Sequence, residues 1–295
     1  MFLDENQVRQ HLHMSDLIPA MEKALIDFST GKVTQPVRSI IKVDPPGGFF
    51  GMMPALAEGL GIKIVTFYPP NAERGLPTHM ATIFLVDPET GAPLAIMDGR
   101  LITEMRTAAV SAAATKHLAP PDARVLAILG SGVQAHSHVE ALSLVRRFEE
   151  IRVWSRAQAH AEQFAKQVGG KAMSAEAAVR GADVIVTVTS STIPVLKGEW
   201  LKPGSHVDAV GAWRPDWREL DDEAMRNVVF VDTRAAAVQE SGDVILSGAK
   251  IYAELGEMFA GKVSPRRDET TIFKSLGMAV EDIAAALLVY RSAAA

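Results

Sequence analysis

Cysteine is absent from this chain of 295 residues. A chain without thiols forms no disulfide bonds and no thiolate metal sites. Eight histidines are present, but they are scattered, and the pairs His11/His13 and His136/His138 are two residues apart. That spacing does not bring two side chains to one helix face. We therefore expect no bound metal.

Long basic and long apolar runs are also missing. The net charge is -5, and Lys and Arg form no run beyond Arg146-Arg147 and Arg266-Arg267, which argues against nucleic-acid binding. No apolar stretch is long enough to span a membrane. Residues 1–6 lack the basic flank and the apolar run of a signal peptide. We expect a cytoplasmic protein that binds neither nucleic acid nor membranes.

The first third of the chain predicts a helix followed by a mostly antiparallel sheet. Residues 4–31 carry apolar side chains at helical spacing, with Asp4 as a candidate cap and Gly31 as a candidate end. Strand-like segments follow at residues 37–43, 61–68, 82–86 and 93–97. The last two flank the turn at 87–91 and predict a hairpin.

An alanine-rich helix is expected over residues 103–118, and Pro120-Pro121 then breaks the chain. Beyond this point, short apolar strands alternate with helices, which is typical of a doubly wound parallel sheet. The expected strands are residues 125–129, 151–154, 182–189, 206–210 and 228–232, and the expected helices are 133–147, 157–168 and 174–180. Residues 270–295 predict a further helix. The predicted class is thus α/β, with a first domain over 1–118 plus about 278–295 and a second over 119–277.

A glycine loop lies between the expected strand at 125–129 and the helix after it. Gly130 permits the tight turn, Gly132 lets the backbone approach a pyrophosphate, and Ala135 lets the helix pack close to the strand. Backbone N–H groups and the helix dipole then face the phosphates. The full loop is Gly130, Ser131, Gly132, Val133, Gln134 and Ala135. It predicts a nicotinamide dinucleotide site, and the alternative is a glycine turn that binds nothing.

The end of the second expected strand bears on the choice of cofactor. Sites for NAD usually place Asp or Glu about 20 residues beyond the loop, on the ribose 2′-hydroxyl. Here Ser155 and Arg156 occupy that place and no acid does. Arg156 is suited to a 2′-phosphate, although a solvated arginine is the alternative. NADP(H) is therefore preferred, with NAD(H) left open.

Three cations of the first domain are candidates for a site. Arg38 and Lys63 lie in expected strands, where a charge on a buried face needs a partner. Arg106 lies in the alanine-rich helix. From the sequence pattern alone, each of the three could be an ordinary surface charge.

The chain resembles the ornithine cyclodeaminase/μ-crystallin family over nearly its whole length. The segments that carry this resemblance are residues 61–66, 98–99, 106–112, the glycine loop, 210–220, 240–244 and 273–282. The resemblance implies a homodimer, a first domain with the dimer sheet and the substrate pocket, and a Rossmann second domain. It also implies that the tail helix returns toward the first domain.

The resemblance also assigns roles to single residues. Arg38 and Arg106 would clamp the substrate carboxylate, and Lys63 would lie beside the reacting carbon–nitrogen bond. The other expected cofactor contacts are Thr107, Thr189, Ser190, Val210, Lys274, Ser275 and Leu276. The expected substrate-pocket residues are Met52, His79 and Trp213, with His79 equally open as an ordinary strand histidine.

One position departs from the cyclodeaminases of this family, which carry an aspartate near the turn at Val210-Gly211. Trp213 occupies that position in this chain, and an indole does not take up a proton. Asp216 is a weak substitute because Pro215 restricts where it points. The segment 214–220 is instead similar to the μ-crystallin branch, which reduces cyclic ketimines.

The resemblance therefore implies NAD(P)H-dependent reduction of a small imino acid to an L-amino acid. The expected substrate is a cyclic ketimine such as Δ1-pyrroline-2-carboxylate or its six-membered homologue. Lys63 would keep the imine nitrogen protonated, with a pKa lowered by the two arginines. The alternatives, in order, are an amino-acid dehydrogenase or linear imine reductase, an ornithine cyclodeaminase, and a binding protein without catalysis.

Overall fold

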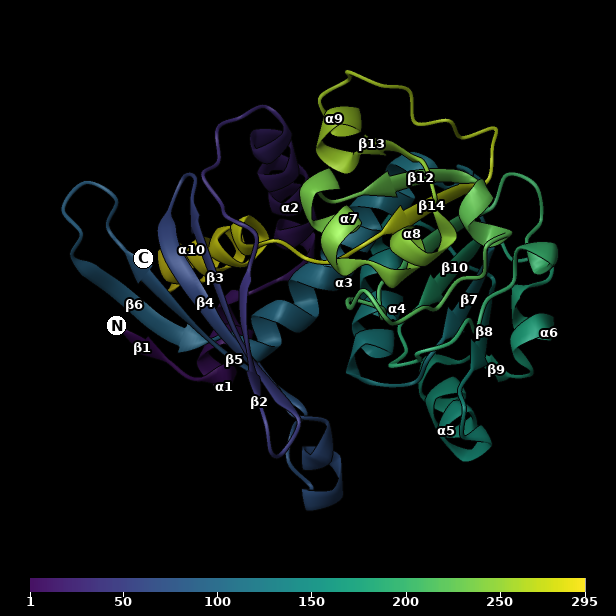
Figure 1. Ribbon diagram of the computed structural model, residues 1–295, viewed down its shortest axis with the longest axis horizontal. Helices are drawn as coiled ribbons and strands as arrows, with labels where there is room; N and C mark the ends of the chain where they lie inside the picture. The colour runs from purple at the N-terminus through teal and green to yellow at the C-terminus, as the bar shows by residue number, and fades with distance from the viewer. Residues whose placement is uncertain (295) are drawn as a thin grey trace. The chain divides into compact units, whose positions relative to one another are not determined.

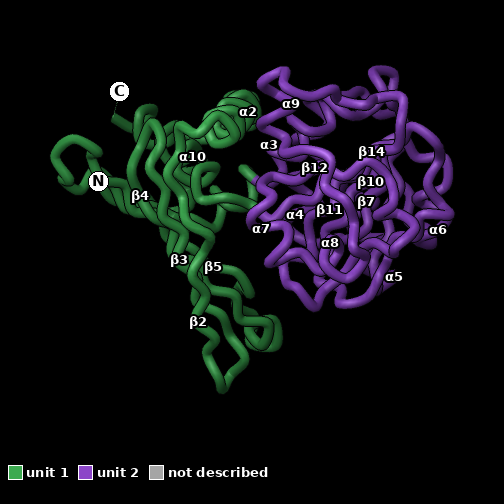
Figure 2. The backbone as a smooth tube through the Cα atoms, turned by 45° about the horizontal axis from the view of Figure 1, so that its top comes forward, with its two compact units in different colours: residues 1–106, 277–295 green, residues 107–276 purple. Residues whose placement is uncertain are grey.

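The computed structural model describes residues 1–294, which form two compact units (Figure 2). Unit 1 comprises Met1–Arg106 and the segment from Gly277 onward, and unit 2 comprises Thr107–Leu276. The division falls inside helix α3 (Arg100–Leu118), whereas the sequence placed it after residue 118. The reason is visible in two hydrogen bonds. Ser111 Oγ lies 3.0 Å from His138 Nε2, and Thr115 Oγ1 donates to Asp208 over 2.8 Å, so the second part of α3 packs within unit 2.

Unit 1 contains a six-stranded sheet (Figure 1). Its strands, in spatial order, are β1 (Phe2–Leu3), β6 (Pro93–Asp98), β5 (His79–Val86), β4 (Leu60–Phe67), β3 (Gly48–Leu56) and β2 (Ser39–Val43). β1 pairs with β6 in parallel, and all the other pairs are antiparallel. The mostly antiparallel sheet is confirmed. The sequence missed β3, whose glycines and proline weaken the strand signal.

The helices of unit 1 cover one face of this sheet. They are α1 (Glu5–His11), α2 (Met14–Ser29) and α10 (Ala279–Ala294). The 3-10 turn η1 (Pro69–Arg74) lies in the connection from β4 to β5. α10 packs on β3, β4, β5 and α2. The single helix expected over residues 4–31 is wrong, because Leu12 and His13 are extended and separate α1 from α2. Asp4 does cap α1, where it accepts the N–H of Gln7 in a capping box.

Unit 2 contains an eight-stranded sheet in which every pair of neighbours is parallel. In spatial order the strands are β13 (Ile251–Glu254), β12 (Val228–Val231), β14 (Thr271–Lys274), β11 (His206–Ala209), β10 (Val184–Thr187), β7 (Val125–Leu129), β8 (Glu150–Trp154) and β9 (Lys171–Ala172). The strand order reverses between β7 and β10. Ligands of doubly wound sheets bind at the carboxyl ends of strands at such a switch point. The predicted α/β class is confirmed.

Helices and turns connect the strands of unit 2 (Figure 1). They are α4 (Val133–Val145), α5 (Gln158–Val168), α6 (Ala175–Val179), α7 (Arg234–Glu240), α8 (Gly242–Ser247), α9 (Leu255–Phe259) and the 3-10 turns η2 (Gly198–Trp200) and η3 (Ala224–Arg226).

The helix expected over residues 270–295 is wrong in its first part. Thr271–Lys274 is the strand β14, which is fully buried between β11 and β12. Gly277 then takes a φ of 77°, and α10 begins at Ala279. Only Ile272 and Phe273 are apolar in this four-residue strand, and so short a segment fits a buried strand and a helix equally well.

Candidate functional site

The glycine loop lies between the carboxyl end of β7 and the start of α4. Gly130 has a φ of 132°, and a Cβ there would lie 2.6 Å from the carbonyl oxygen of Val188. The Gly130 N–H donates to the carbonyl oxygen of Trp154 over 2.8 Å. The loop is therefore fixed against the ends of β8 and β10, and only glycine fits its first position.

The space in front of α4 suits a dinucleotide pyrophosphate. Gly132 is the N-cap of this 13-residue helix, and no side chain caps it. A Cβ on Gly132 would meet nothing within 4 Å, while Ala135 is fully buried as close helix packing requires. Helix N-terminal N–H groups bind phosphate where such space is open to them. The residues present thus fit a dinucleotide.

The end of β8 supplies polar groups beside this loop. Ser131 Oγ donates to Ser155 Oγ over 2.9 Å, which joins the loop to the end of β8. Arg156 follows and is exposed. Neither of the two residues that follow this strand is a carboxylate, so the feature that usually marks a site for NAD is missing here.

The turns after β10 and β11 lie at the same edge of the sheet. Thr189 and Val210 are half-buried, and Ser190 is exposed. A Cβ on Gly211 would lie 2.6 Å from the Thr189 nitrogen, so the two turns are in contact. These three expected contacts therefore lie together at the carboxyl ends of β10 and β11.

The remaining expected cofactor residues are more enclosed. Lys274 and Ser275 are buried, and the Lys274 ammonium lies 3.2 Å from the carboxylate of Asp243. The Lys274 side chain thus makes a buried ion pair inside unit 2. Leu276 donates its N–H to Asp232 over 2.6 Å.

Thr107 and Trp213 are the last two expected site residues of unit 2. Thr107 is buried on α3, four residues before Ser111 and on the same helix face. Trp213 is half-buried against the core of unit 2, with its ring centroid 5.8 Å from that of Trp217 in an edge-on contact.

Asp216, the weak candidate for an acid, is exposed and pairs with Arg214 over 3.1 Å. The hydrogen bond from Arg214 lowers the pKa of Asp216, so the group stays a carboxylate. It is therefore held at the surface of unit 2 by its own neighbour in the chain.

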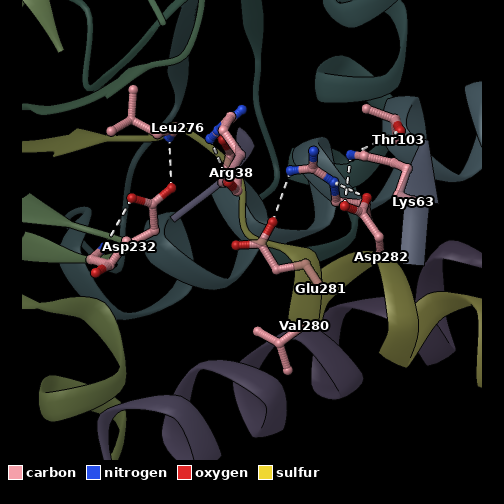
Figure 3. Close-up of polar contacts among 12 residues, drawn as sticks. Arg38, Lys63, Thr103, Asp232, Leu276, Val280, Glu281 and Asp282 are labelled. Carbon is pink, nitrogen blue, oxygen red and sulfur yellow. Dashed lines mark hydrogen bonds and ion pairs between the residues drawn. The ribbon is translucent and has the colours of Figure 1, made fainter. Parts of the chain in front are cut away.

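In unit 1, Lys63 and Arg106 meet at the carboxylate of Asp282. Figure 3 shows Lys63 beside Asp282. The Lys63 ammonium lies 2.6 Å from Asp282 Oδ2, and Arg106 Nε donates to Asp282 Oδ1 over 2.9 Å. Arg106 also donates to Glu281 over 2.8 Å, and Lys63 Nζ donates to the Thr103 hydroxyl over 3.4 Å. All four charged side chains are buried. We call Lys63, Arg106, Glu281 and Asp282 the charged cluster.

Arg38 reaches the same region through Gly277. It donates to the Gly277 carbonyl oxygen over 2.9 Å. A Cβ on Gly277 would collide with the Arg106 guanidinium, so Gly277 lies against both arginines. The structure therefore brings the three cations singled out in the sequence to one place in unit 1.

The surroundings shift the pKa values of two groups in the cluster. Burial lowers the pKa of Lys63 to about 8; Asp282 opposes this shift, and Arg106 and Arg38 add to it. Burial alone would raise the pKa of Asp282, but Arg106 and Lys63 outweigh it and lower the pKa. The cluster thus combines an ionised carboxylate with an ammonium that gives up its proton near neutral pH.

His79 and Met52 lie on opposite faces of the sheet. His79 pairs with Phe67, which is four residues beyond Lys63 on β4, so His79 and Lys63 share a face. Burial lowers the pKa of His79 to about 4, and Lys63 and Arg106 add to the effect. Met52 pairs with Ile64 and lies on the other face, away from the charged cluster.

Sequence reasoning gave no role to Asp282 and Glu281. One signal was available, because buried cations require carboxylate partners and both residues end the segment 273–282 that carries the family resemblance. Among residues 1–294, no three His, Asp or Glu side chains form a group that could hold a metal ion. None of the helices formed by residues 1–294 has the length and apolar character needed to cross a bilayer.

Unit 2 is doubly wound and carries a dinucleotide loop at its switch point. Unit 1 buries a lysine among arginines and carboxylates. These two features define an NAD(P)-dependent oxidoreductase. The model of the ornithine cyclodeaminase/mu-crystallin family matches residues 1–295. The chain belongs to this family.

Individual relatives match over nearly the whole chain. Ketimine reductase mu-crystallin of Mus musculus is 53% identical, over 99% of this chain and 96% of its own. The structure of Thermococcus litoralis Delta(1)-pyrroline-2-carboxylate reductase in complex with NADH and L-proline is 37% identical, with a TM-score of 0.95 over 100% of this chain and 97% of that one. An archaeal alanine dehydrogenase dimer with bound NAD is 33% identical, with a TM-score of 0.95 over 100% of this chain and 96% of that one.

Proposed function

We propose that this protein reduces a small imino acid to the corresponding amino acid with NADPH or NADH. The observation that carries the proposal is the buried Lys63 ammonium, with its lowered pKa, in one cluster with two guanidinium groups. The ammonium is a proton donor for an imine nitrogen, and the two guanidinium groups are hydrogen-bond donors for a carboxylate. An α-imino acid carries both an imine nitrogen and a carboxylate. The names of the mu-crystallin and pyrroline-carboxylate reductase relatives support the same reaction.

In this proposal Arg38 and Arg106 bind the substrate carboxylate, and Lys63 keeps the imine nitrogen protonated. A protonated imine carbon is electrophilic, and the bound nicotinamide supplies the hydride that it accepts. Lys63 is suited to its task because a donor with a pKa near the working pH both holds and releases a proton readily. Asp282 holds the ammonium in place from 2.6 Å.

The cofactor would be held by unit 2. The loop Gly130 to Ala135 would take the pyrophosphate, Ser155 and Arg156 the adenosine end, and Thr189, Ser190 and Val210 the nicotinamide end. Arg156 without a neighbouring carboxylate favours NADP(H) over NAD(H). Thr107 and Leu276 stay predicted contacts. Lys274 and Ser275 are buried, and they too stay predicted contacts.

The preferred substrate is a small cyclic ketimine such as Δ1-pyrroline-2-carboxylate. A linear imino acid is the second candidate, since the archaeal alanine dehydrogenase is similar over 96% of its length. Ornithine cyclodeamination is disfavoured, because Trp213 supplies no base and Asp216 is tied to Arg214 on the surface.

An assay of the purified protein tests the function. It would be mixed with NADPH or NADH and a panel of cyclic and linear imino acids, and loss of the reduced nicotinamide absorbance would be followed. Turnover with a cyclic ketimine, faster with NADPH, is expected. Ammonia release from ornithine without net cofactor turnover would support a cyclodeaminase, and bound cofactor without either activity would support a binding protein.

A homodimer is part of the proposal. The face of the unit 1 sheet opposite α10 carries apolar side chains that remain exposed in the single chain, among them Ile41 (53%), Ile64 (38%) and Met80 (41%). Apolar sheet faces of this kind mark interaction surfaces. We propose that two copies pair through this face, as the archaeal dimer suggests.

The dimer is tested with Ile64→Glu, which should give a monomer by light scattering. A dimer that survives this change would place the interface elsewhere. The cytoplasmic location stays a prediction from the sequence.

A further inference from the structure

Glu219 makes four hydrogen bonds to the ends of two neighbouring strands of unit 2. Its Oε1 accepts from the Thr189 N–H and the Thr189 hydroxyl, both over 2.7 Å. Its Oε2 accepts from the Thr187 hydroxyl over 2.8 Å and from the Gly211 N–H over 2.6 Å. Glu219 is fully buried. Both oxygens are thus used, and all four partners are donors.

These bonds join two turns that already touch. Thr187 ends β10 and Thr189 follows it, while Gly211 follows β11. A Cβ on Gly211 would collide with the backbone of Thr189, so no side chain fits between the turns. One buried carboxylate therefore holds the two turns as a single rim at the carboxyl edge of the sheet.

The groups bonded to Glu219 favour a hydrogen-bond acceptor between the two turns. Asp243 Oδ1 accepts the N–H groups of Glu219 and Leu220 over 2.8 and 3.0 Å, which fixes the backbone from which Glu219 extends. Burial raises the pKa of Glu219; Lys274 opposes the shift and Asp243 adds to it. Protonation of Glu219 would add an O–H donor at a place where four donors already converge. The ionised carboxylate is therefore the form that holds both turns.

We propose that Glu219 is a positioning residue for the nicotinamide half of the dinucleotide. The inference rests on the proposed function and extends it to a residue that touches no substrate. The proposed places of the pyrophosphate and the adenosine, at the glycine loop and Arg156, lie on the β7 and β8 side of the switch point. The other half of the molecule then extends over β10 and β11, whose turns Glu219 joins.

The test compares two ligands on Glu219→Gln. The amide replaces one oxygen by an NH2 donor, which then opposes the donors of one turn. Affinity for NADPH should fall by about tenfold, and kcat should fall as well, whereas affinity for the adenosine fragment 2′,5′-ADP should not change. In the wild type, NADPH affinity should weaken at low pH more than fragment affinity, and Glu219→Gln should remove that difference.

Asp183→Asn is the matched control, because Asp183 also clamps backbone groups but at the opposite edge of the sheet. Its Oδ2 accepts the N–H groups of Arg124 and Val125 over 2.8 Å each, at the start of β7. Loss of stability is expected in Asp183→Asn without any change in the ratio of the two affinities. Thermal unfolding of each variant gives the stability.

Several results would overturn the inference. Equal loss of NADPH and fragment binding in Glu219→Gln would mean a purely structural role, and unchanged NADPH binding and kcat would mean no role. If Glu219→Gln does not fold, Thr187→Val removes one of the four donors and should weaken NADPH alone, by a few-fold. A wild type that binds the fragment but neither NADPH nor NADH would instead refute the proposed function.

Discussion

The ammonium of Lys63 lies 2.6 Å from the carboxylate of Asp282, and both groups are buried. Two opposing effects act on the pKa of Lys63 at this contact. Burial, Arg106 and Arg38 lower the pKa of Lys63, while Asp282 raises it, and the balance is about 8. Asp282 thus raises the pH at which Lys63 loses its proton, against the larger effect of burial.

Replacement of Asp282 by Asn should therefore shift the pH profile of reduction. Since the carboxylate raises the pKa of Lys63, its removal lowers that pKa. Lys63 must be protonated to act as the acid, so activity should fall as pH rises through about 8 in the wild type and at a lower pH in the variant. The measurement is kcat against pH.

Glu281→Gln is the matched control for this shift, because Glu281 is a buried carboxylate of the same cluster that pairs with Arg106. In the profile of kcat against pH, the alkaline fall of Glu281→Gln should remain close to that of the wild type. If the alkaline fall of Asp282→Asn also stays at the wild-type pH, the role of Lys63 is contradicted.

Arg106 should contribute strongly to stability, because it is the buried partner of both Glu281 and Asp282. Arg106→Met leaves two carboxylates buried without the positive charge that pairs with them. We therefore expect a loss of about 3–5 kcal/mol in the free energy of unfolding. Denaturant unfolding measures it. Arg124→Met is the comparison, since Arg124 pairs with Glu149 on the surface and should cost less than about 1 kcal/mol. If Arg106→Met lost as little free energy of unfolding as Arg124→Met, the charged cluster would add little to stability.

The two glycines of the dinucleotide loop should respond differently to alanine. Gly130→Ala forces a Cβ against the Val188 carbonyl at a φ of 132°, so the stability of unit 2 should fall. Gly132→Ala meets nothing within 4 Å and should fold normally, but its methyl group would lie in the space proposed for the pyrophosphate. Thermal unfolding and NADPH titration together separate the two effects. Normal NADPH binding by a folded Gly132→Ala would argue against this placement of the cofactor.

Arg156 should decide between the two cofactors. The side chain is exposed and follows β8 without a neighbouring acid. Arg156→Ser should raise KM for NADPH by about tenfold or more, since a charge-assisted contact to the 2′-phosphate is lost, and should leave KM for NADH almost unchanged. Steady-state kinetics with both cofactors measure the ratio. Parallel changes in both KM values would refute selection by Arg156.

The parts of the fold that follow from local rules could be predicted from the sequence. β7, the glycine loop and α4 are read from an apolar run, turn glycines and a helix start that lie next to one another in the chain. β14 could not be identified in this way, because its strand conformation depends on pairing with β11 and β12. The break between α1 and α2 was missed for a similar reason, since Leu12 is buried although it is not helical.

The candidate site shows the same limit. The sequence singled out Arg38, Lys63 and Arg106, but the family resemblance was needed to bring them together. The choice of Asp282 as a shared partner of Lys63 and Arg106 depends on where α10 packs, and α10 lies far along the chain from β4. Charge pairing of this kind is tertiary information, which periodicity and spacing do not contain.

The position of β14 has a consequence for the order of events during synthesis. The strand is central in the sheet of unit 2 but is made after the other strands, and α10, which covers the sheet of unit 1, is made later still. At the ribosome, where chains grow by about 5–20 residues per second, neither unit has all its strands and covering helices until this stretch emerges. We therefore expect both units to complete their folding at nearly the same moment, and nascent chains to need protection until then.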